Sequence, residues 1–275
     1  MPRPLKIGVI GAGAWGKKII STLAHLPDVE LSYLVSRNPK SLELVDGSCL
    51  VVPDWRELGF PDFLDALFIA SPSETHYEIS CAALDAKLPI FVEKPVCLSS
   101  EDAVQLEDKA KSSGAIVMVD HVDLFNEAYR ALKTNLRLIA PIREVEISIG
   151  ARGPYRDSHS SLWDWGPHAV GLALDLAEGE LKIKKVSCSH TEFGAVYEIA
   201  GVARSGFSIH IATGNGFQER SRKVSVRGSE GSLLYDDHRQ NRLVRVRPDG
   251  FEEVLVGAPS TFPLTQAAVD FLELV

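Results

Sequence analysis

The stretch that decides the fold reads Lys6-Ile7-Gly8-Val9-Ile10-Gly11-Ala12-Gly13-Ala14-Trp15-Gly16. It begins as an apolar run typical of a buried strand and passes through a glycine turn into a helical pattern. The G-x-G-x-x-G spacing of Gly11, Gly13 and Gly16 suits a tight turn, a backbone that approaches a pyrophosphate, and a helix packed closely on the strand. Free N–H groups at the helix start attract phosphate. We therefore predict dinucleotide binding; the alternative is a strand-turn-helix whose glycines serve packing alone.

Length and composition limit the class of protein. The 275 residues suffice for two domains, and 45% hydrophobic and 24% charged residues are ordinary for a globular protein. The net charge of −8 argues against nucleic acid and anionic membrane surfaces as partners. Apolar runs are too short to span a membrane, the N-terminus does not resemble a signal peptide, and the 4 cysteines lack C-x-x-C spacing. We expect a cytoplasmic protein with reduced thiols and no metal site.

Residues 5 to about 120 alternate between short apolar runs and helical patterns. The apolar runs lie at Ile7–Ile10, Leu31–Val35, Cys49–Val52, Ala66–Ala70, Ile90–Val92 and Ile116–Val119, and the helical patterns at Lys17–Leu26, Thr75–Ala86 and Asp102–Ser112. This alternation predicts a doubly wound parallel sheet, so we assign residues 1–121 to an α/β domain of the Rossmann type. Ligands of such a sheet bind outside the carboxyl ends of the strands.

The pattern changes after about residue 121. A helix is expected at Glu127–Leu138, a strand at Glu144–Ile149 and a second helix at Asp164–Leu176. From Lys184 onward, strand-like segments follow one another without helices, at Val196–Ala203, Phe207–Ala212, Lys223–Arg227, Leu233–Tyr235 and Leu243–Val246, before a last helix at Pro263–Val275. Residues 122–275 are therefore predicted to form an α+β domain with a mostly antiparallel open sheet.

The second predicted strand ends in Ser36-Arg37-Asn38. An NAD-type site places a carboxylate at this point to bind the ribose 2′-hydroxyl, and the sequence has none. A hydroxyl from Ser36 and a guanidinium from Arg37 suit a 2′-phosphate instead. NADP(H) is therefore favoured, NAD(H) stays possible, and the alternative for Arg37 is an ordinary exposed arginine.

The fifth predicted strand ends in Glu93-Lys94-Pro95, at the edge where a ligand would lie. The proline restricts Lys94 to an extended backbone, and the peptide bond between them is a candidate for the cis form. A lysine held in this way can bind a substrate hydroxyl or polarise a carbonyl. From these three residues alone, a surface lysine in a turn is the more common interpretation.

Taken together, these motifs resemble the Gfo/Idh/MocA family of NAD(P)-dependent oxidoreductases. The resemblance rests on residues 5–16, on Ala70-Ser71-Pro72 with His76, on Glu93-Lys94-Pro95, on the stretch from Met118 to Asn126 and on the stretch from Val226 to Leu233. It covers nearly the whole chain, and the order of the motifs is more specific than any one of them. It implies that Lys94 is the essential active-site cation. It further implies that the second domain binds substrate and carries an exposed sheet through which homodimers or homotetramers form.

The segment from Leu162 to His168 is similar to the family's D-x-G-x-H motif. Asp164 and His168 are four residues apart, so they share one face of a helix. The resemblance gives His168 the transfer of the hydroxyl proton, with Asp164 in support; the alternative is a helix cap and a structural histidine. Since Pro167 suits only a first helical turn, the helix is expected to start near Asp164. Where the family often has an aspartate three residues after the histidine, this chain has Gly171. Members also run some tens of residues further, so the resemblance implies a short member or a truncated chain.

The predicted reaction interconverts a secondary alcohol and a ketone on a sugar, nucleotide sugar or polyol. Cofactor contacts are predicted from Gly11, Gly13, Ala14, Trp15, Gly16, Ser36, Arg37, Ser71, Pro72, His76, Glu93 and Lys94, and substrate contacts from Lys94, Arg152, Tyr155, Asp164 and His168. Two alternatives stay open: a regulatory protein that binds NAD(P) without turnover, and a reductase of a cyclic non-sugar substrate.

Overall fold

The computed structural model describes residues 3–57, 60, 62–239, 242–258 and 260–275. The chain forms two compact units. Unit 1 comprises the residues up to Asp120 together with Leu264–Val275, and unit 2 comprises His121–Pro263. Within the described ranges, every helix falls short of the combination of length and apolar character needed to cross a membrane.

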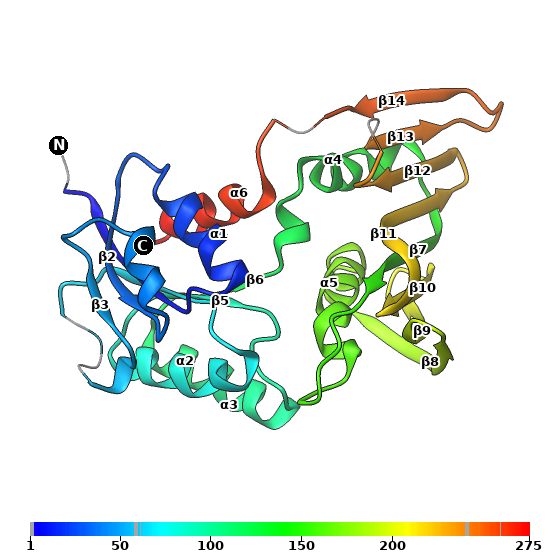
Figure 1. Cartoon of the computed structure of the whole chain (residues 1–275). Coiled ribbons are helices and arrows are strands. Elements are labelled where there is room, and N and C mark those ends of the chain that lie inside the picture. The colour runs from blue at the N-terminus through cyan, green and yellow to red at the C-terminus, as the bar shows by residue number, and fades with distance from the viewer. Residues whose placement is uncertain (1–2, 58–59, 61, 240–241, 259) are drawn as a thin grey trace. The chain divides into compact units, whose positions relative to one another are not determined.

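Unit 1 is built on a six-stranded parallel sheet with the strand order β3-β2-β1-β4-β5-β6. The strands are β1 (Leu5–Ile10), β2 (Val29–Val35), β3 (Leu50–Val52), β4 (Ala66–Ile69), β5 (Ile90–Glu93) and β6 (Val117–Asp120). Four helices flank the sheet: α1 (Ala14–Leu23), α2 (His76–Asp85), α3 (Ser100–Ser113) and α6 (Pro263–Leu272). In Figure 1, α1 and α6 lie on one face and α2 and α3 on the other. The predicted doubly wound Rossmann fold is thereby confirmed.

The start of the first helix differs from the prediction. We expected Lys17–Leu26, and α1 begins at Ala14, directly after its N-cap residue Gly13. The apolar periodicity that guided the prediction starts only where the helix faces the sheet, so it missed the first turn. Ala14 and Trp15 are therefore the first two helical residues, next to the glycine turn.

The last helix belongs to unit 1, whereas we had predicted residues 122–275 as one domain. Phe271 of α6 is fully buried and packs edge-on against Phe68 of β4, with ring centroids 5.4 Å apart. It also contacts Phe91 of β5 at 5.7 Å. Burying one such aromatic side chain contributes roughly 1.5–3 kcal/mol. The apolar face of α6 thus covers the parallel sheet, which the order of elements along the chain does not reveal.

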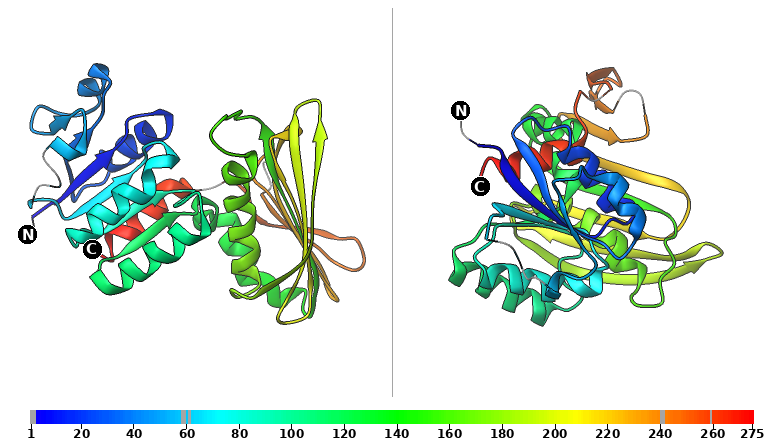
Figure 2. Two further views of the ribbon diagram at one scale, coloured as in Figure 1. Left: turned by 90° about the horizontal axis from the view of Figure 1, so that it is seen from below. Right: turned by 60° about the vertical axis from the view of Figure 1, so that its left-hand side comes forward.

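Unit 2 contains an eight-stranded sheet with the order β14-β13-β12-β11-β7-β10-β9-β8. The strands are β7 (Ile142–Arg152), β8 (Leu181–Thr191), β9 (Gly194–Ala203), β10 (Ser208–Gly214), β11 (Gly216–Gly228), β12 (Gly231–Asp236), β13 (Leu243–Val246) and β14 (Glu252–Val256). Only the central β7–β10 pair among these is parallel, so the mostly antiparallel sheet is confirmed. Helices α4 (Glu127–Asn135) and α5 (Ser161–Leu176) cover one face, and Figure 2 shows the other face of the described sheet without a helix.

Helix α5 begins at Ser161, one turn before the predicted start. Pro167 therefore lies inside the helix rather than in its first turn, and its ring nitrogen cannot donate to the carbonyl of Trp163. Contacts with the preceding loop compensate, because Asp164 accepts hydrogen bonds from Arg156 and the indole N–H of Trp165 donates to the carbonyl of Gly153 at 2.9 Å. Tertiary contacts thus extend the helix beyond the limit that the proline alone would set.

Strand β14 of the eight-stranded sheet was not predicted from the sequence.

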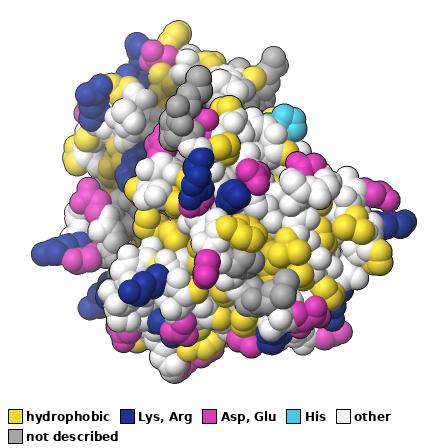
Figure 3. Space-filling view, turned by 90° about the vertical axis from the view of Figure 1, so that its left-hand side faces the viewer, with side chains coloured by type: hydrophobic (Ala, Val, Ile, Leu, Met, Phe, Trp, Pro, Cys, Tyr) yellow, Lys and Arg dark blue, Asp and Glu magenta, His cyan; other side chains and the backbone are white. Residues whose placement is uncertain are grey.

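Acidic and basic side chains are interspersed on the face shown in Figure 3, with apolar side chains between them. Such mixing of signs is ordinary for a protein with a net charge of −8.

Candidate functional site

The glycine turn between β1 and α1 combines two glycines that packing requires with one that faces open space. Gly11 has a φ of +99°, and a Cβ there would lie 2.5 Å from the backbone oxygen of Ala70. A Cβ on Gly16 would run into the backbone oxygen of Gly11. Around Gly13, no described atom lies within 4 Å of the Cβ position, and this N-cap residue provides no side-chain hydrogen bond to α1. The helix start therefore leaves room and N–H groups for a phosphate, so these residues fit a dinucleotide pyrophosphate.

The segment after β2 brings two of the predicted residues to the same edge of the sheet. The amide of Gly11 donates to the carbonyl of Val35 at 2.9 Å, which joins the end of β2 to the glycine turn. Ser36 is half-buried, with its hydroxyl 2.7 Å from that of Ser41, while Arg37 is exposed. A hydroxyl and a guanidinium suit the 2′-phosphate of NADP(H). The contact between Ser36 and Ser41 was not predicted, because the two residues meet only when the turn after β2 brings them together.

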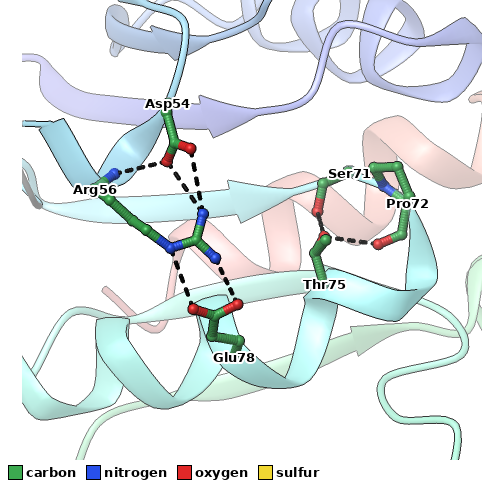
Figure 4. A network of polar contacts seen from close by, with 6 residues as sticks. All are labelled: Asp54, Arg56, Ser71, Pro72, Thr75 and Glu78. Atoms are coloured by element: carbon green, nitrogen blue, oxygen red, sulfur yellow. Dashed lines mark hydrogen bonds and ion pairs between the residues drawn. The ribbon is translucent and has the colours of Figure 1, made fainter.

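Two sets of polar contacts fix the segments that follow β3 and β4 (Figure 4). Arg56 reaches both Asp54, at 3.3 Å, and Glu78 of α2, at 2.6 Å. The hydroxyl of Ser71 lies 2.7 Å from that of Thr75, which donates to the carbonyl of Pro72 at 2.7 Å. Exposed ion pairs such as those of Arg56 add little to stability, but the contacts set the course of these loops. Ser71 and Pro72, predicted cofactor contacts, thus lie in an ordered turn just beyond β4.

His76 joins the loop after β4 to the loop after β5. Its Nδ1 lies 2.9 Å from the carbonyl oxygen of Pro95, and its Nε2 lies 2.9 Å from that of Ser71. The ring is buried, and burial lowers the pKa of His76. Because both ring nitrogens face backbone carbonyls, His76 helps to position the Lys94–Pro95 segment. Its direct contact with cofactor stays a prediction.

The residues before Lys94 form a buried carboxyl pair. Glu93 ends β5 directly beside Asp120 at the end of β6, and both side chains are buried. Burial, followed by the charge of Asp120, raises the pKa of Glu93 to about 10, so the pair holds a proton at neutral pH. The indole N–H of Trp15 donates to Asp120 at 3.4 Å. Glu93 and Trp15, both predicted to contact cofactor, are thus linked through Asp120, for which the sequence analysis predicted no role. Lys94 is half-buried, and its peptide bond to Pro95 is cis.

His168 lies on α5 in unit 2, but the structure changes the carboxylate beside it. Its Nδ1 is 2.7 Å from Oδ2 of Asp123, a residue of the short helix η4 (Val122–Phe125). Asp164, which we predicted as the support, accepts from Nε of Arg156 at 2.8 Å and 3.0 Å and lies 3.7 Å from Nε2 of His159. Helical spacing placed Asp164 on the face of His168, yet a charge-assisted pair with Arg156 engages that carboxylate. The support of His168 by Asp164 stays a prediction, and the carboxylate that lies beside Nδ1 is that of Asp123, which we did not predict as a site residue.

Two predicted substrate contacts, Arg152 and Tyr155, both contact Phe193 in the turn between β8 and β9. The guanidinium of Arg152 lies 3.9 Å from the ring centroid of Phe193, and its Nε donates to the carbonyl of Gln218 at 3.0 Å. The hydroxyl of Tyr155 donates to the carbonyl of Phe193 at 2.8 Å. These contacts hold the loop before α5 in place. Substrate binding by Arg152 and Tyr155 stays a prediction.

Comparison with known proteins finds one matching family model and three similar proteins. A family model described as "Oxidoreductase family, NAD-binding Rossmann fold" matches residues 5–121. A crystal structure from Magnetospirillum magnetotacticum MS-1, of a protein assigned to the oxidoreductases, is similar to this chain with a TM-score of 0.85 and 34% identity; the match covers 98% of this chain and 91% of that one. Among curated proteins, an inositol 2-dehydrogenase of Acidothermus cellulolyticus is 33% identical over 49% of this chain. A scyllo-inositol 2-dehydrogenase (NADP(+)) of Bacillus subtilis is 22% identical over 98% of this chain and 88% of its own length. The chain spans 41% of the length of the Acidothermus relative.

Proposed function

Because the chain belongs to the Gfo/Idh/MocA family of NAD(P)-dependent oxidoreductases, we propose that it transfers a hydride between NADP(H) and a secondary alcohol or ketone. The proposed substrate class is a sugar, nucleotide sugar or polyol. Two relatives support this class, since one is named an inositol 2-dehydrogenase and the other a scyllo-inositol 2-dehydrogenase that uses NADP(+).

The observation that carries the proposal is the arrangement at the carboxyl edge of the sheet in unit 1. The open glycine turn follows β1, Ser36 and Arg37 follow β2, and Lys94 follows β5. In a doubly wound sheet this edge is where the ligand binds. A phosphate-binding turn, two groups suited to a 2′-phosphate and a lysine therefore occupy the edge that a nicotinamide dinucleotide requires.

The residues of this chain would share the work as follows. Gly11, Gly13 and the N-terminus of α1 hold the pyrophosphate, and Ser36 with Arg37 binds the 2′-phosphate. A bound nicotinamide would supply the hydride chemistry, as acceptor during alcohol oxidation and as donor during ketone reduction. The ammonium of Lys94 binds the substrate oxygen and stabilises negative charge that develops on it. His168 accepts the hydroxyl proton as the carbonyl forms and returns it during reduction.

Self-association is proposed as well, in the form of a homodimer or homotetramer. Edge strand β8 supports it, because it exposes the apolar side chains of Ile183 and Val186. Size-exclusion chromatography with light scattering tests this. A purely monomeric protein at micromolar concentration would contradict it.

The experiment that tests the activity is a turnover screen. Purified protein is incubated with NADP⁺ or NAD⁺ and a panel of inositols, aldoses and sugar nucleotides, and reduced cofactor is followed by absorbance. Turnover of a polyhydroxylated substrate with NADP⁺ is the expected result. Cofactor binding without turnover of any panel member, in either direction, would favour a regulatory protein. Turnover confined to cyclic non-sugar carbonyl compounds would keep the enzyme and contradict the substrate class.

A further inference from the structure

Three segments that lie far apart in the sequence meet at one carboxylate in unit 2. Asp123 of η4 places Oδ2 2.7 Å from Nδ1 of His168 on α5. Its other oxygen, Oδ1, pairs with the guanidinium of Arg222 on β11. The side chains are nearly inaccessible, with exposed fractions of 4% for Asp123, 10% for His168 and 13% for Arg222. Each oxygen of the carboxylate therefore has its own partner in a site largely shielded from water.

We propose that Asp123 is the positioning residue for His168, and that it holds the imidazole with the proton on Nδ1 and leaves Nε2 as the proton acceptor. The inference rests on the proposed function for its catalytic meaning, although the arrangement itself can be measured without turnover. The positive charge of Arg222 then keeps Asp123 ionised, and its ion pair with Oδ1 holds the carboxylate in place.

The chemistry of the three groups fixes the tautomer. An ionised carboxylate has only acceptor sites, so a neutral imidazole that faces it must present an N–H. With the proton on the ring nitrogen that lies 2.7 Å from Asp123, Nε2 carries the lone pair that can take a proton from a substrate hydroxyl. The opposite tautomer would place two acceptors against each other at Nδ1 and leave Nε2 unable to accept. Arg222 strengthens this choice, because a fixed positive charge favours the ionised form of Asp123.

Two further observations explain why this chain uses Asp123. The position three residues after His168 is Gly171, and a Cβ there would lie 3.0 Å from Nδ1 of His121. The segment that carries His121 and Asp123 thus packs against α5 where a larger side chain would crowd it. Asp164, the carboxylate one turn before His168 on α5, accepts from Arg156. The carboxylate at Nδ1 therefore comes from η4 instead of from α5.

The test is ¹⁵N NMR of protein labelled at histidine, which distinguishes the protonated from the unprotonated ring nitrogen. The His168→Gln variant identifies the signals of His168 among those of the 8 histidines. The main variant is Asp123→Asn, which keeps the shape of the side chain and removes its charge. A double variant, Asp123→Asn with Arg222→Met, avoids a buried guanidinium without its partner and so guards against loss of folding. The matched control is Asp237→Asn, which removes a carboxylate that accepts from Arg242 at 2.5 Å and from Asn126 at 3.1 Å.

The expected wild-type spectrum shows His168 protonated at Nδ1, and the control shows the same. In both Asp123 variants the proton moves to Nε2, because the asparagine amide can donate to Nδ1. With a substrate from the panel, turnover falls by about 10²- to 10⁴-fold while NADPH affinity is unchanged, as expected when a catalytic histidine is held in the wrong tautomer. An Asp123→Glu variant that retains the Nδ1–H form recovers part of the activity.

An unchanged Nδ1–H tautomer in Asp123→Asn and in the double variant would overturn the proposal, as would turnover equal to that of the control. If the tautomer moves as expected but the wild-type protein turns over no panel substrate, the assignment of Asp123 stands and the proposed function fails. The two failures are therefore distinguishable.

Discussion

The glycine turn of unit 1 and the His168 cluster of unit 2 solve different physical problems. The turn is built from neighbouring residues, and its demands are steric: Gly11 and Gly16 have backbone where a Cβ would be. The cluster draws on residues up to 99 positions apart, and its demands are electrostatic, since Asp123 lies between His168 and Arg222. Substitutions in the turn should therefore act through volume, and substitutions in the cluster through charge. The following variants test where that distinction holds.

Lys94 is the expected exception to this distinction. It lies in unit 1, where the glycine turn depends on backbone packing, but it is expected to act through its charge. Lys94→Ala is predicted to lower turnover by about 10³-fold, equivalent to about 4 kcal/mol, because the developing charge on the substrate oxygen loses its cation. NADPH binding should persist. Steady-state kinetics on the best panel substrate and a parallel NADPH titration measure the two effects. Turnover within a few-fold of wild type would remove Lys94 from the mechanism.

Gly16→Ala tests the steric side directly. The added methyl group meets the backbone oxygen of Gly11, so the turn must shift, and we expect a loss of about 3 kcal/mol in the free energy of unfolding together with loss of NADPH binding. Gly13→Ala is the matched control, because its methyl group enters open space. It should unfold within about 1 kcal/mol of wild type and still weaken NADPH binding. Urea unfolding of both variants decides the matter, and equal stabilities would contradict the steric account.

Ser36→Asp tests whether charge at the end of β2 selects the cofactor, next to a glycine turn whose demands are steric. A carboxylate at this position repels the 2′-phosphate and can bind the ribose 2′-hydroxyl, so the ratio of NADPH to NADH affinity should fall at least about tenfold, or about 1.4 kcal/mol. Ser41→Ala, which removes only the neighbouring hydroxyl, serves as the control and should change the ratio much less. An unchanged ratio in Ser36→Asp would show that the end of β2 does not select the cofactor.

Glu93 places a titrating group beside the predicted cofactor edge, and its effect on stability accumulates gradually with pH. The folded chain keeps a proton on the Glu93–Asp120 pair that the unfolded chain releases, between the usual pKa of 4.5 and the raised value of about 10. Stability attributable to this proton is complete below that window and declines as pH rises through it, by up to about 1.4 kcal/mol per pH unit. Glu93→Gln cannot ionise, so its stability relative to wild type should increase with pH. Urea unfolding from about pH 6 to about pH 9 measures this, and parallel curves would refute it.

Local patterns predicted the parts of the molecule that depend on neighbouring residues. The apolar runs gave all six strands of unit 1, and the glycine spacing gave the turn that Gly11, Gly13 and Gly16 form. The sequence patterns did not predict the parts of the molecule that depend on contacts between residues far apart in the chain. The apolar face of α6 does not say which sheet it covers, and Phe271 finds its aromatic partners only in the folded chain.

The sequence did not predict the carboxylate beside His168 for the same reason. Helical spacing correctly placed Asp164 and His168 on one helix, but it carries no information about Arg156, which binds Asp164, or about η4, which delivers Asp123. The sequence nevertheless held one indication, because Gly171 stands where the family resemblance led us to expect an aspartate. A missing acid near a histidine that is proposed to be catalytic is a reason to look for another acid elsewhere in the chain.

The most direct test of the central claim is a titration of the purified protein with NADPH and with NADH, followed by tryptophan fluorescence. We predict saturable binding of both, with NADPH at least about tenfold tighter because Ser36 and Arg37 bind its 2′-phosphate. Tighter binding of NADH would contradict the cofactor preference. Binding of neither would contradict the function itself, since the glycine turn would then serve the fold alone.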